Sequence, residues 1–366
     1  MLATPPKSQS VRPETRPTPA KPGNKGSNLQ VVRERSLPTG NTLVKDVLTS
    51  YKDRERERSK KDTPAPNSLK DKTQDNFLEI LLCPPRYLST EIANNAWMKK
   101  MKAEDKKVNI DKAMSQFFTL YGLLAQDAMA YLLPPNPGLQ DEVYISNAGM
   151  LLPHLKEKTF VLSNFKAEGR PGEERVLNYF LKLTDFKQHF CPYKWEGEAE
   201  TKWLRDNIYF FGYGMRSDVK AFKWMEEKFN CRGIYIHETD PLRYHLDCSI
   251  FPINRECVLL ADDIPSGERK QIESVAEVVL VSKKDSQEAI TNCVRVGSII
   301  YNATTINNLK RTEDEYKHEL HKNETLEKIC SDKGLSLVWV NLSELEKSGA
   351  ALSCCVLHLS RIAYPA

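Results

Sequence analysis

The stretch that decides how the rest of the chain is interpreted is Gly349-Ala350-Ala351-Leu352-Ser353-Cys354-Cys355-Val356-Leu357-His358-Leu359. A turn of small residues runs there into a predicted strand, and Cys354 and Cys355 stand where the turn ends. A thiol at such a turn lies near backbone N–H groups, which favour its thiolate, and it can face a cleft. Free cysteines are also often buried as small core residues. The stretch alone leaves both interpretations open.

The composition bounds the class of protein. The 366 residues suffice for one large domain or two ordinary ones, and 40% hydrophobic with 28% charged residues is typical of a globular protein. We find no apolar run of membrane-spanning length and no signal-peptide core. The nine cysteines are scattered without a C-x-x-C pair, which argues against a disulfide scaffold or zinc site and favours a reducing compartment. We expect a cytoplasmic protein without a membrane partner, and leave open secretion without a signal peptide.

Residues 1–72 differ from the rest. They hold 9 of the 21 prolines and 16 lysines and arginines against 8 acidic residues. Such a segment cannot bury enough apolar surface to offset chain entropy, so we predict a disordered basic tail before a folded domain at 73–366. Its charges are mixed in sign at 54–58 and Tyr51 is its one aromatic residue, so no nucleic-acid partner is expected. The sequence does not indicate what the tail binds.

From residue 77 onwards, short predicted strands alternate with predicted helices. An apolar run stopped by prolines begins this region, and apolar residues at helical spacing follow. The alternation predicts an α/β fold. The predicted strands are 77–82, 143–145, 159–162, 208–211, 234–236, 246–251, 258–260, 278–281, 296–301 and 336–342, and the main predicted helices are 110–124, 173–183, 218–229 (capped by Ser217), 270–276 and 313–333.

Chemically versatile residues stand at the predicted ends of strands. They are Asn147, Glu196, His245 with Asp247, and Cys354. A nucleophilic cysteine needs a proton acceptor, usually histidine, and often a carboxylate that orients it. His245 and Asp247 are two positions apart, so we expect them on one face of a strand, where they can also be merely solvated.

Two arginines stand in turns that contain glycine, Arg170 and Arg216. Each can be a solvated charge, but as a pair they can clamp a carboxylate because the planar guanidinium offers two parallel donors. His237 and His245 lack the spacing of paired metal ligands, so no metal site is expected.

Eight motifs, in order along the chain, resemble the guanidine-modifying (pentein) enzymes. The similarity covers about residues 77–366 and is strongest to the arginine dihydrolase branch, near dimethylarginine dimethylaminohydrolase and arginine deiminase. The motifs are Leu82-Cys83-Pro84-Pro85, Asn95-Ala96-Trp97-Met98, Ser146-Asn147-Ala148-Gly149, the run from Val161 through Arg170-Pro171-Gly172-Glu173-Glu174, Trp195-Glu196-Gly197, Gly212-Tyr213-Gly214-Met215-Arg216-Ser217, Tyr244-His245-Leu246-Asp247, and 349–354.

The resemblance implies a five-bladed α/β propeller of ββαβ-type modules with pseudo-fivefold symmetry, an active site at its centre, and no metal or organic cofactor. It also implies roles for individual residues. Cys354 matches the nucleophile, His245 the general acid and base, Glu196 the catalytic carboxylate, Asp247 and Asn147 the groups that hold the guanidinium, Arg170 and Arg216 the arginines that bind the substrate carboxylate, and Asn95 an asparagine near the substrate.

The implied activity is hydrolysis of arginine or a related small guanidine compound through a covalent thiouronium intermediate on Cys354. Most deiminases resemble one another in having aspartate where this chain has Asn147, and an amide can donate to a ureido oxygen. We therefore hypothesise that citrulline is retained and cut to ornithine, with release of citrulline as the deiminase alternative. An amidinotransferase, a dimethylarginine dimethylaminohydrolase, and an inactive pentein module that only binds are also compatible with the resemblance. A homo-oligomer is left open.

The chain departs from the family pattern at several positions. The usual Glu-Gly-x-Gly-Asp reads Glu196-Gly197-Glu198-Ala199-Glu200 here. Asn164 stands where arginine is usual and Ala96 where proline is usual. These changes leave the substrate open.

Overall fold

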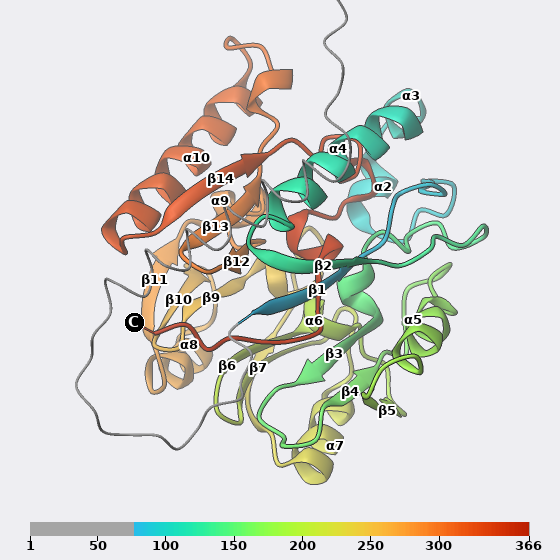
Figure 1. The fold of residues 1–366 in the computed structure, drawn as a ribbon. Coiled ribbons are helices and arrows are strands. Elements are labelled where there is room, and N and C mark those ends of the chain that lie inside the picture. The colour runs from blue at the N-terminus through green and yellow to red at the C-terminus, as the bar shows by residue number, and fades with distance from the viewer. Residues whose placement is uncertain (1–76, 366) are drawn as a thin grey trace, which may run out of the picture. The chain divides into compact units, whose positions relative to one another are not determined.

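The computed structural model describes residues 77–365, which form five small sheets of three strands each (Figure 1). In every sheet the middle strand pairs antiparallel with one neighbour and parallel with the other. The sheets are β15 (Leu357–His358), β1 (Leu78–Leu82) and β2 (Ala128–Leu132); β3 (Gly149–Leu152), β4 (Thr159–Leu162) and β5 (Lys187–Phe190); β6 (Thr201–Arg205), β7 (Ile208–Tyr213) and β8 (Arg232–His237); β9 (Ile250–Asn254), β10 (Cys257–Ala261) and β11 (Glu277–Val281); β12 (Val294–Val296), β13 (Ile299–Ala303) and β14 (Ser336–Val340).

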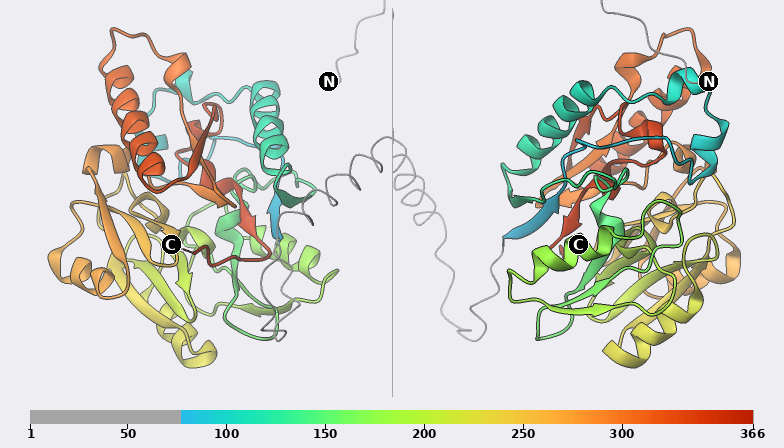
Figure 2. Two further views of the ribbon diagram at one scale, coloured as in Figure 1. Left: turned by 60° about the vertical axis from the view of Figure 1, so that its left-hand side comes forward. Right: turned by 90° about the vertical axis from the view of Figure 1, so that its right-hand side faces the viewer.

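A crossover helix joins the two parallel strands of each sheet. Parallel strands need such a connection, and all five helices lie on the outside of the sheets (Figure 2). They are α4 (Ile110–Leu124), α5 (Glu173–Leu181), α7 (Val219–Phe229), α8 (Ser266–Glu273) and α10 (Asp314–Asp332). Shorter elements complete the described chain: α2 (Ala96–Lys100), α3 (Ala103–Lys106), α6 (Gly197–Glu200), α9 (Lys283–Gln287), and the 3-10 turns η1 (Ile145–Ala148), η2 (Leu246–Cys248), η3 (Ile306–Asn308), η4 (Glu346–Ser348) and η5 (Leu352–Cys355).

The helices bury one apolar face against the sheets. In α4 the buried side chains include Ala113, Phe117, Leu120 and Leu124, which recur at helical spacing. The buried apolar residues form five clusters in all. Each repeat of two strands, a helix and a strand in the described residues therefore has a hydrophobic core beside it, which agrees with the α/β fold predicted from the alternation and with the five modules implied by the resemblance.

The first sheet is completed by the last strand. Ile80 of β1 lies opposite His358 of β15, and Leu81 lies opposite Leu357. The antiparallel strand of this repeat thus comes from the far end of the described chain, and the pairing closes the set of five repeats.

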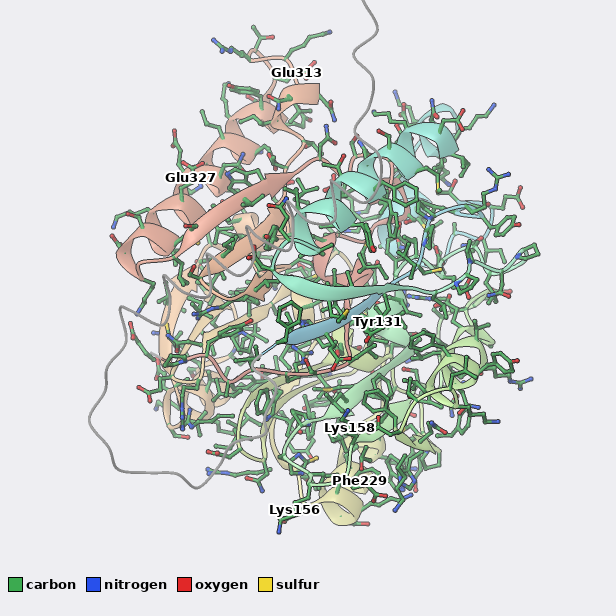
Figure 3. The ribbon with its side chains drawn as sticks, in the orientation of Figure 1. Tyr131, Lys156, Lys158, Phe229, Glu313 and Glu327 are labelled. Atoms are coloured by element: carbon green, nitrogen blue, oxygen red, sulfur yellow. The ribbon has the colours of Figure 1, made fainter. Side chains whose placement is uncertain are left out.

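The predicted site residues lie toward the middle of the described part of the molecule, and charged side chains of the outer helices lie at its edge. Figure 3 shows Glu313, the N-cap of α10, and Glu327 on α10 at the edge of the molecule, where Glu327 Oε1 accepts a hydrogen bond from Trp339 Nε1 of β14 at 3.0 Å. By contrast, α6 packs against η1, η2 and η5, the segments that carry the predicted site residues. Short, tightly turned segments rather than long helices therefore position the candidate site.

Some sequence predictions were wrong in detail. The run 143–145 is not a strand, because the chain turns there into η1 and β3 begins only at Gly149. His245 and Asp247 do not lie on a strand face, since η2 occupies Leu246–Cys248 and β9 begins at Ile250. Short buried apolar runs look alike in strands and in buried turns, so periodicity cannot separate them.

Two further elements differ. The strand predicted at 296–301 is two strands, β12 and β13, separated by a turn at Gly297 with φ +60°. The N-cap of α7 is Asp218 rather than Ser217. The Ser217 hydroxyl instead accepts a hydrogen bond from the backbone N–H of Glu196 at 3.3 Å.

The tail predicted at 1–72 lies outside the described residues. Within 77–365, no helix has both the length and the apolar character needed to cross a lipid bilayer. In the same part of the chain all nine cysteines are free thiols, and no group of three or more histidine, cysteine, aspartate or glutamate residues is arranged to hold a metal ion.

Candidate active site

Glu196 is the most densely hydrogen-bonded carboxylate of the site. It is fully buried, and its Oε1 accepts from the backbone N–H groups of Lys166 at 3.1 Å and Ala167 at 2.9 Å. Its Oε2 accepts from Arg216 Nη1 at 2.8 Å and faces His245 Nε2 at 2.7 Å. Burial acts to raise the pKa of Glu196, but Arg216 and His245 outweigh it and hold that pKa well below its usual range. Glu196 is therefore an ionised, immobile carboxylate.

His245 is held between Glu196 and the start of η2. Burial lowers the pKa of His245, although the bond to Glu196 acts in the opposite direction. With Glu196 ionised, the proton of the neutral ring lies on Nε2 and donates to Glu196. The lone pair on Nδ1 is then the one that can take up a proton.

Cys354 and Asp247 face each other. Cys354 Sγ donates to Asp247 Oδ2 at 3.3 Å, and the same oxygen accepts from the Ser353 hydroxyl at 2.9 Å. Asn292 Nδ2 lies 3.8 Å from the sulfur. Burial, and then the charge of Asp247, raise the pKa of Cys354 to about 12. Cys354 is accordingly a thiol, not a thiolate, in the protein without substrate.

The two predicted carboxylate-binding arginines are both engaged. Arg170 donates to Glu173 through Nε at 2.9 Å and through Nη2 at 2.6 Å. In the amide orientation that pairs both polar atoms of Asn147, its oxygen accepts from Arg170 Nη1 at 3.0 Å. Arg216 donates from Nη2 to the backbone carbonyl of Asn94 at 2.9 Å, besides its bond to Glu196. All three guanidinium nitrogens of Arg170 are therefore engaged, so a substrate carboxylate there has to displace some of these partners, whereas Arg216 uses two of its five N–H donors in these bonds.

Asn95 fastens two loops together. Its Oδ1 caps α2 by accepting from the backbone N–H of Met98 at 2.9 Å, and its Nδ2 donates to the carbonyl of Ser348 at 2.7 Å. A Cβ on Gly349 would come within 2.9 Å of the Asn95 side chain. Contact of Asn95 with substrate stays a prediction. In the structure, the Asn95 side chain holds residues 94–95 against residues 348–349.

Two cavities meet at His245 and Cys354. The smaller, of about 10 Å³, is lined by six of the eight predicted site residues and has room for about one water. The larger, of about 190 Å³, is lined by His245, Asp247 and Cys354, and Glu196 is buried behind His245. The structure thus brings all eight predicted residues together, and their individual roles remain predictions. The six residues of the smaller cavity are Asn95, Asn147, Arg170, Arg216, His245 and Cys354.

The altered segment after Glu196 has a definite place. Glu200 Oε2 accepts at 3.2 Å from the backbone N–H of Leu246, the residue between His245 and Asp247. Glu198 turns elsewhere and accepts from His358 Nδ1 at 2.8 Å. Glu200 is a positioning residue that sequence reasoning missed. Its signal was its place at the end of the altered motif.

Gly197 permits the close approach of α6 to η1. Its φ is +61°, and a Cβ there would lie 2.5 Å from the carbonyl oxygen of Ser146 and 2.7 Å from that of Asn147. We expect Gly197→Ala to lower the free energy of unfolding by at least about 1–2 kcal/mol, because an L-residue is strained in this conformation. Urea unfolding measures this loss. Gly267→Ala is the control, since no atom lies within 4 Å of its Cβ position, and an equal loss there would contradict the explanation.

The buried Glu200 makes stability depend on pH. Burial, and then the charge of Glu238, raise the pKa of Glu200 well above its usual value. The folded state therefore holds this proton more tightly than the unfolded state does, and stability is lost as the pH rises from the unfolded pKa toward neutrality and above. We expect the melting temperature of Glu200→Gln to depend less on pH between pH 5 and pH 8 than that of the wild type does. Exposed Glu324→Gln is the matched control, and parallel wild-type and Glu200→Gln curves would contradict this.

Comparison with known families gives one match over most of the chain. The family model for eukaryotic N,N dimethylarginine dimethylhydrolase matches residues 84–361. The chain belongs to this dimethylarginine dimethylhydrolase family. The match spans every motif from which the resemblance was drawn, apart from the first residues of the earliest.

Relatives of this dimethylarginine dimethylhydrolase-family chain include enzymes named for two different activities. The bifunctional arginine dihydrolase/ornithine cyclodeaminase AgrE of Nostoc sp. is 24% identical over 295 residues, which are 77% of this chain and 38% of AgrE. The dimethylarginine dimethylaminohydrolase of Mycobacterium tuberculosis is 22% identical over 281 residues, which are 76% of this chain and 84% of the relative. The chain therefore spans well under half the length of the dihydrolase relative.

A solved structure confirms the fold of this family member. The N-terminal domain of the cyanobacterial arginine dihydrolase ArgZ, bound to its substrate, superposes with a TM-score of 0.67 at 22% identity and covers 77% of this chain and 98% of that domain. The five repeats are thus the five blades of a pentein-type α/β propeller. At this identity the likeness establishes architecture, and the activity has to be argued from the site.

Proposed function

We propose that the chain is a cysteine-dependent hydrolase of arginine or a closely related guanidine compound. The observation that carries the proposal is a pair of buried hydrogen bonds. Cys354 Sγ donates to Asp247, and His245 is hydrogen-bonded to Glu196. The charge of Asp247 disfavours a thiolate on Cys354, whereas a carboxylate in this position suits a cationic guanidinium. The site is therefore built to become reactive when the substrate supplies the positive charge.

The reaction follows from the positions of the protons. When a guanidinium enters, its charge offsets Asp247, and the Sγ proton of Cys354 passes to His245. The thiolate attacks the guanidinium carbon, and ammonia leaves with the proton that His245 returns. Water then attacks the thiouronium carbon while His245 takes its proton, and Sγ departs and recovers that proton. The balance is arginine plus water giving citrulline plus ammonia.

The dihydrolase hypothesis extends this cycle by one round. Retained citrulline and a second water give ornithine, carbon dioxide and a second ammonia. Support comes from Asn147, because an amide has N–H donors where a carboxylate can only accept. Its NH2 group lies 3.2 Å from the Tyr144 carbonyl and 3.3 Å from the Ser146 hydroxyl, so it has to exchange one of these partners for the ureido oxygen. Relatives that are named as arginine dihydrolases support the same hypothesis.

The test is an incubation of the full chain with arginine, asymmetric dimethylarginine, agmatine and citrulline, with the products identified by mass spectrometry. Ornithine with two ammonia molecules per arginine is the expected result. Accumulation of citrulline without ornithine would show deiminase activity and would contradict the dihydrolase hypothesis. Dimethylamine released from dimethylarginine faster than ammonia from arginine would assign the substrate differently.

An amidinotransferase is the second candidate, and the larger cavity favours it. Beside Cys354 this cavity carries the side chains of Asp247, Glu288 and Glu346, which suit a protonated amine. Once His245 has taken its proton, an acceptor amine there would attack the thiouronium carbon in place of water, and Sγ would depart and recover that proton. Arginine with isotopically labelled amidino carbon and a primary amine would place the label in a new guanidine product, whereas label found only in carbon dioxide or citrulline would exclude transfer.

A further inference from the structure

A third cavity, of about 70 Å³, lies outside the proposed active site. It is bounded by β6, β9 and β12 and by residues 361–364, and Ser353 is the wall that it shares with the Cys354 turn. A single buried water needs roughly 10–15 Å³ of such space, so there is room for a small polyatomic ion. Its charged lining consists of Lys202, Arg255, Arg295, Arg361 and one acid, Glu198.

The single acid of this cavity is already used. Glu198 Oε2 accepts from Arg361 Nη2 at 2.6 Å and from His358 Nδ1 at 2.8 Å. Burial lowers the pKa of His358, so the histidine is neutral at neutral pH and adds no charge. Among the cations of the cavity, Glu198 makes its direct ion pair with Arg361, and Lys202 acts on it only as a weaker, more distant charge.

The remaining basic groups lack a carboxylate partner among residues 77–365. Lys202 Nζ makes no hydrogen bond or ion pair there, although the residue is only partly exposed. Arg361 Nε is buried without an acceptor. Arg295 donates only to backbone carbonyls, those of Ile253 and Gly297, and its guanidinium stacks on the Tyr364 ring at 4.2 Å. Partly buried positive charge without a counter-charge is costly and attracts an anion.

We propose that this cavity is a binding site for a small oxyanion, namely a phosphate or a short carboxylate, with Lys202 and Arg361 as its principal ligands. Lys202 supplies a point charge and Arg361 the free Nε–H, a pairing suited to a tetrahedral or planar oxyanion. The site is separate from the guanidine site and does not depend on the proposed function.

The position of the cavity links it to the nucleophile. Ser353 donates to Asp247 Oδ2, the oxygen that also accepts from Cys354, and its backbone N–H donates to Asn292 Oδ1 at 2.7 Å. Burial dominates the raised pKa of Cys354, and Lys202 is a positive charge that opposes it. An anion bound to Lys202 offsets its positive charge, so Lys202 no longer acts to lower the pKa of Cys354. Occupation of the cavity therefore slows reactions of the Cys354 thiol.

The binding test uses inorganic phosphate and succinate with the full chain. Thermal unfolding is measured in each anion against chloride at equal ionic strength, and phosphate affinity is titrated by phosphorus NMR. At least one of the two anions should raise the melting temperature of the wild type. Lys202→Gln should weaken that binding roughly tenfold or more, because a charged hydrogen bond is lost. Lys202→Arg should retain it.

Exposed Lys223→Gln on α7 is the matched control for lost charge and should bind like the wild type. Unchanged affinity in Lys202→Gln, or no stabilisation of the wild type by either anion, would overturn the proposal. The link to the nucleophile is read in a Cys355→Ser background, where Cys354 is the one cysteine of its tryptic peptide. Saturating anion should slow iodoacetamide labelling of Cys354, and this slowing should vanish in Lys202→Gln.

Discussion

Cys354→Ser is expected to reduce turnover of guanidine substrates by at least about 10³-fold and to leave the fold intact. The serine hydroxyl is too weakly acidic to replace the thiolate, yet it can keep the hydrogen bond to Asp247 that Sγ makes at 3.3 Å. Initial rates from ammonia release, together with the melting temperature, measure both parts. Loss of activity accompanied by unfolding would not count as support.

Cys355→Ser is the matched control one residue away. Cys355 is fully buried, its Sγ lies 3.7 Å from the carbonyl of Ala351, and it lines neither cavity at the site. We expect this variant to retain most of the wild-type rate. If Cys355→Ser abolished turnover and Cys354→Ser did not, the nucleophile would be wrongly assigned.

Because the Cys354 side chain is a thiol in the protein without substrate, alkylation of Cys354 in the wild type should accelerate as the pH rises beyond 9.

Glu196→Gln is expected to lower turnover by about 10²-fold or more and to destabilise the fold by roughly 3–5 kcal/mol. The amide has one acceptor oxygen, so its NH2 group faces N–H donors either at Arg216 and His245 or at the backbone of Lys166 and Ala167. The buried Arg216 guanidinium also loses its counter-charge, and the His245 ring loses the anion that fixes its tautomer. Rates and urea unfolding measure the two effects. The control is Glu344→Gln, which breaks ion pairs to Lys112 and Lys347 away from the cavities.

The same variant has a distinct pH signature. The pKa of Glu196 is depressed in the fold, so its stabilising contribution is present above the unfolded pKa near 4.5 and is lost as the pH falls below it. The stability gap between wild type and Glu196→Gln should therefore narrow on acidification below pH 5. A gap that stays constant down to pH 3, or normal turnover in Glu196→Gln, would contradict the role given to this carboxylate.

The sequence predicted some regular elements to the residue, both in the long helical apolar pattern of 110–124 and in one short strand. The helix predicted at 110–124 has the bounds of α4, and the strand at 159–162 has those of β4. Short apolar runs failed at 143–145 and 246–251, because the chain buries those side chains in 3-10 turns whose local pattern resembles a strand.

The order of motifs along the chain was sufficient to predict the candidate site residues, but it could not predict their hydrogen-bond partners. Nothing local indicates that Asn95 donates to the carbonyl of Ser348 or that Glu200 accepts from the backbone N–H of Leu246. Contacts between distant segments depend on how the five repeats are arranged in space. A linear motif therefore names candidate groups, and the three-dimensional fold decides which hydrogen bonds they have left to offer a substrate.

The pairing of β15 with β1 has a consequence for how the protein is made. β1 is synthesised among the first of the described residues and waits for β15, the last strand of the described chain to be made. The nucleophile lies immediately before β15, so it cannot reach Asp247 until this long loop has closed. A ribosome-bound chain that stops short of residue 358 should carry no assembled site, and reactivity should begin only after β15 has emerged and paired with β1.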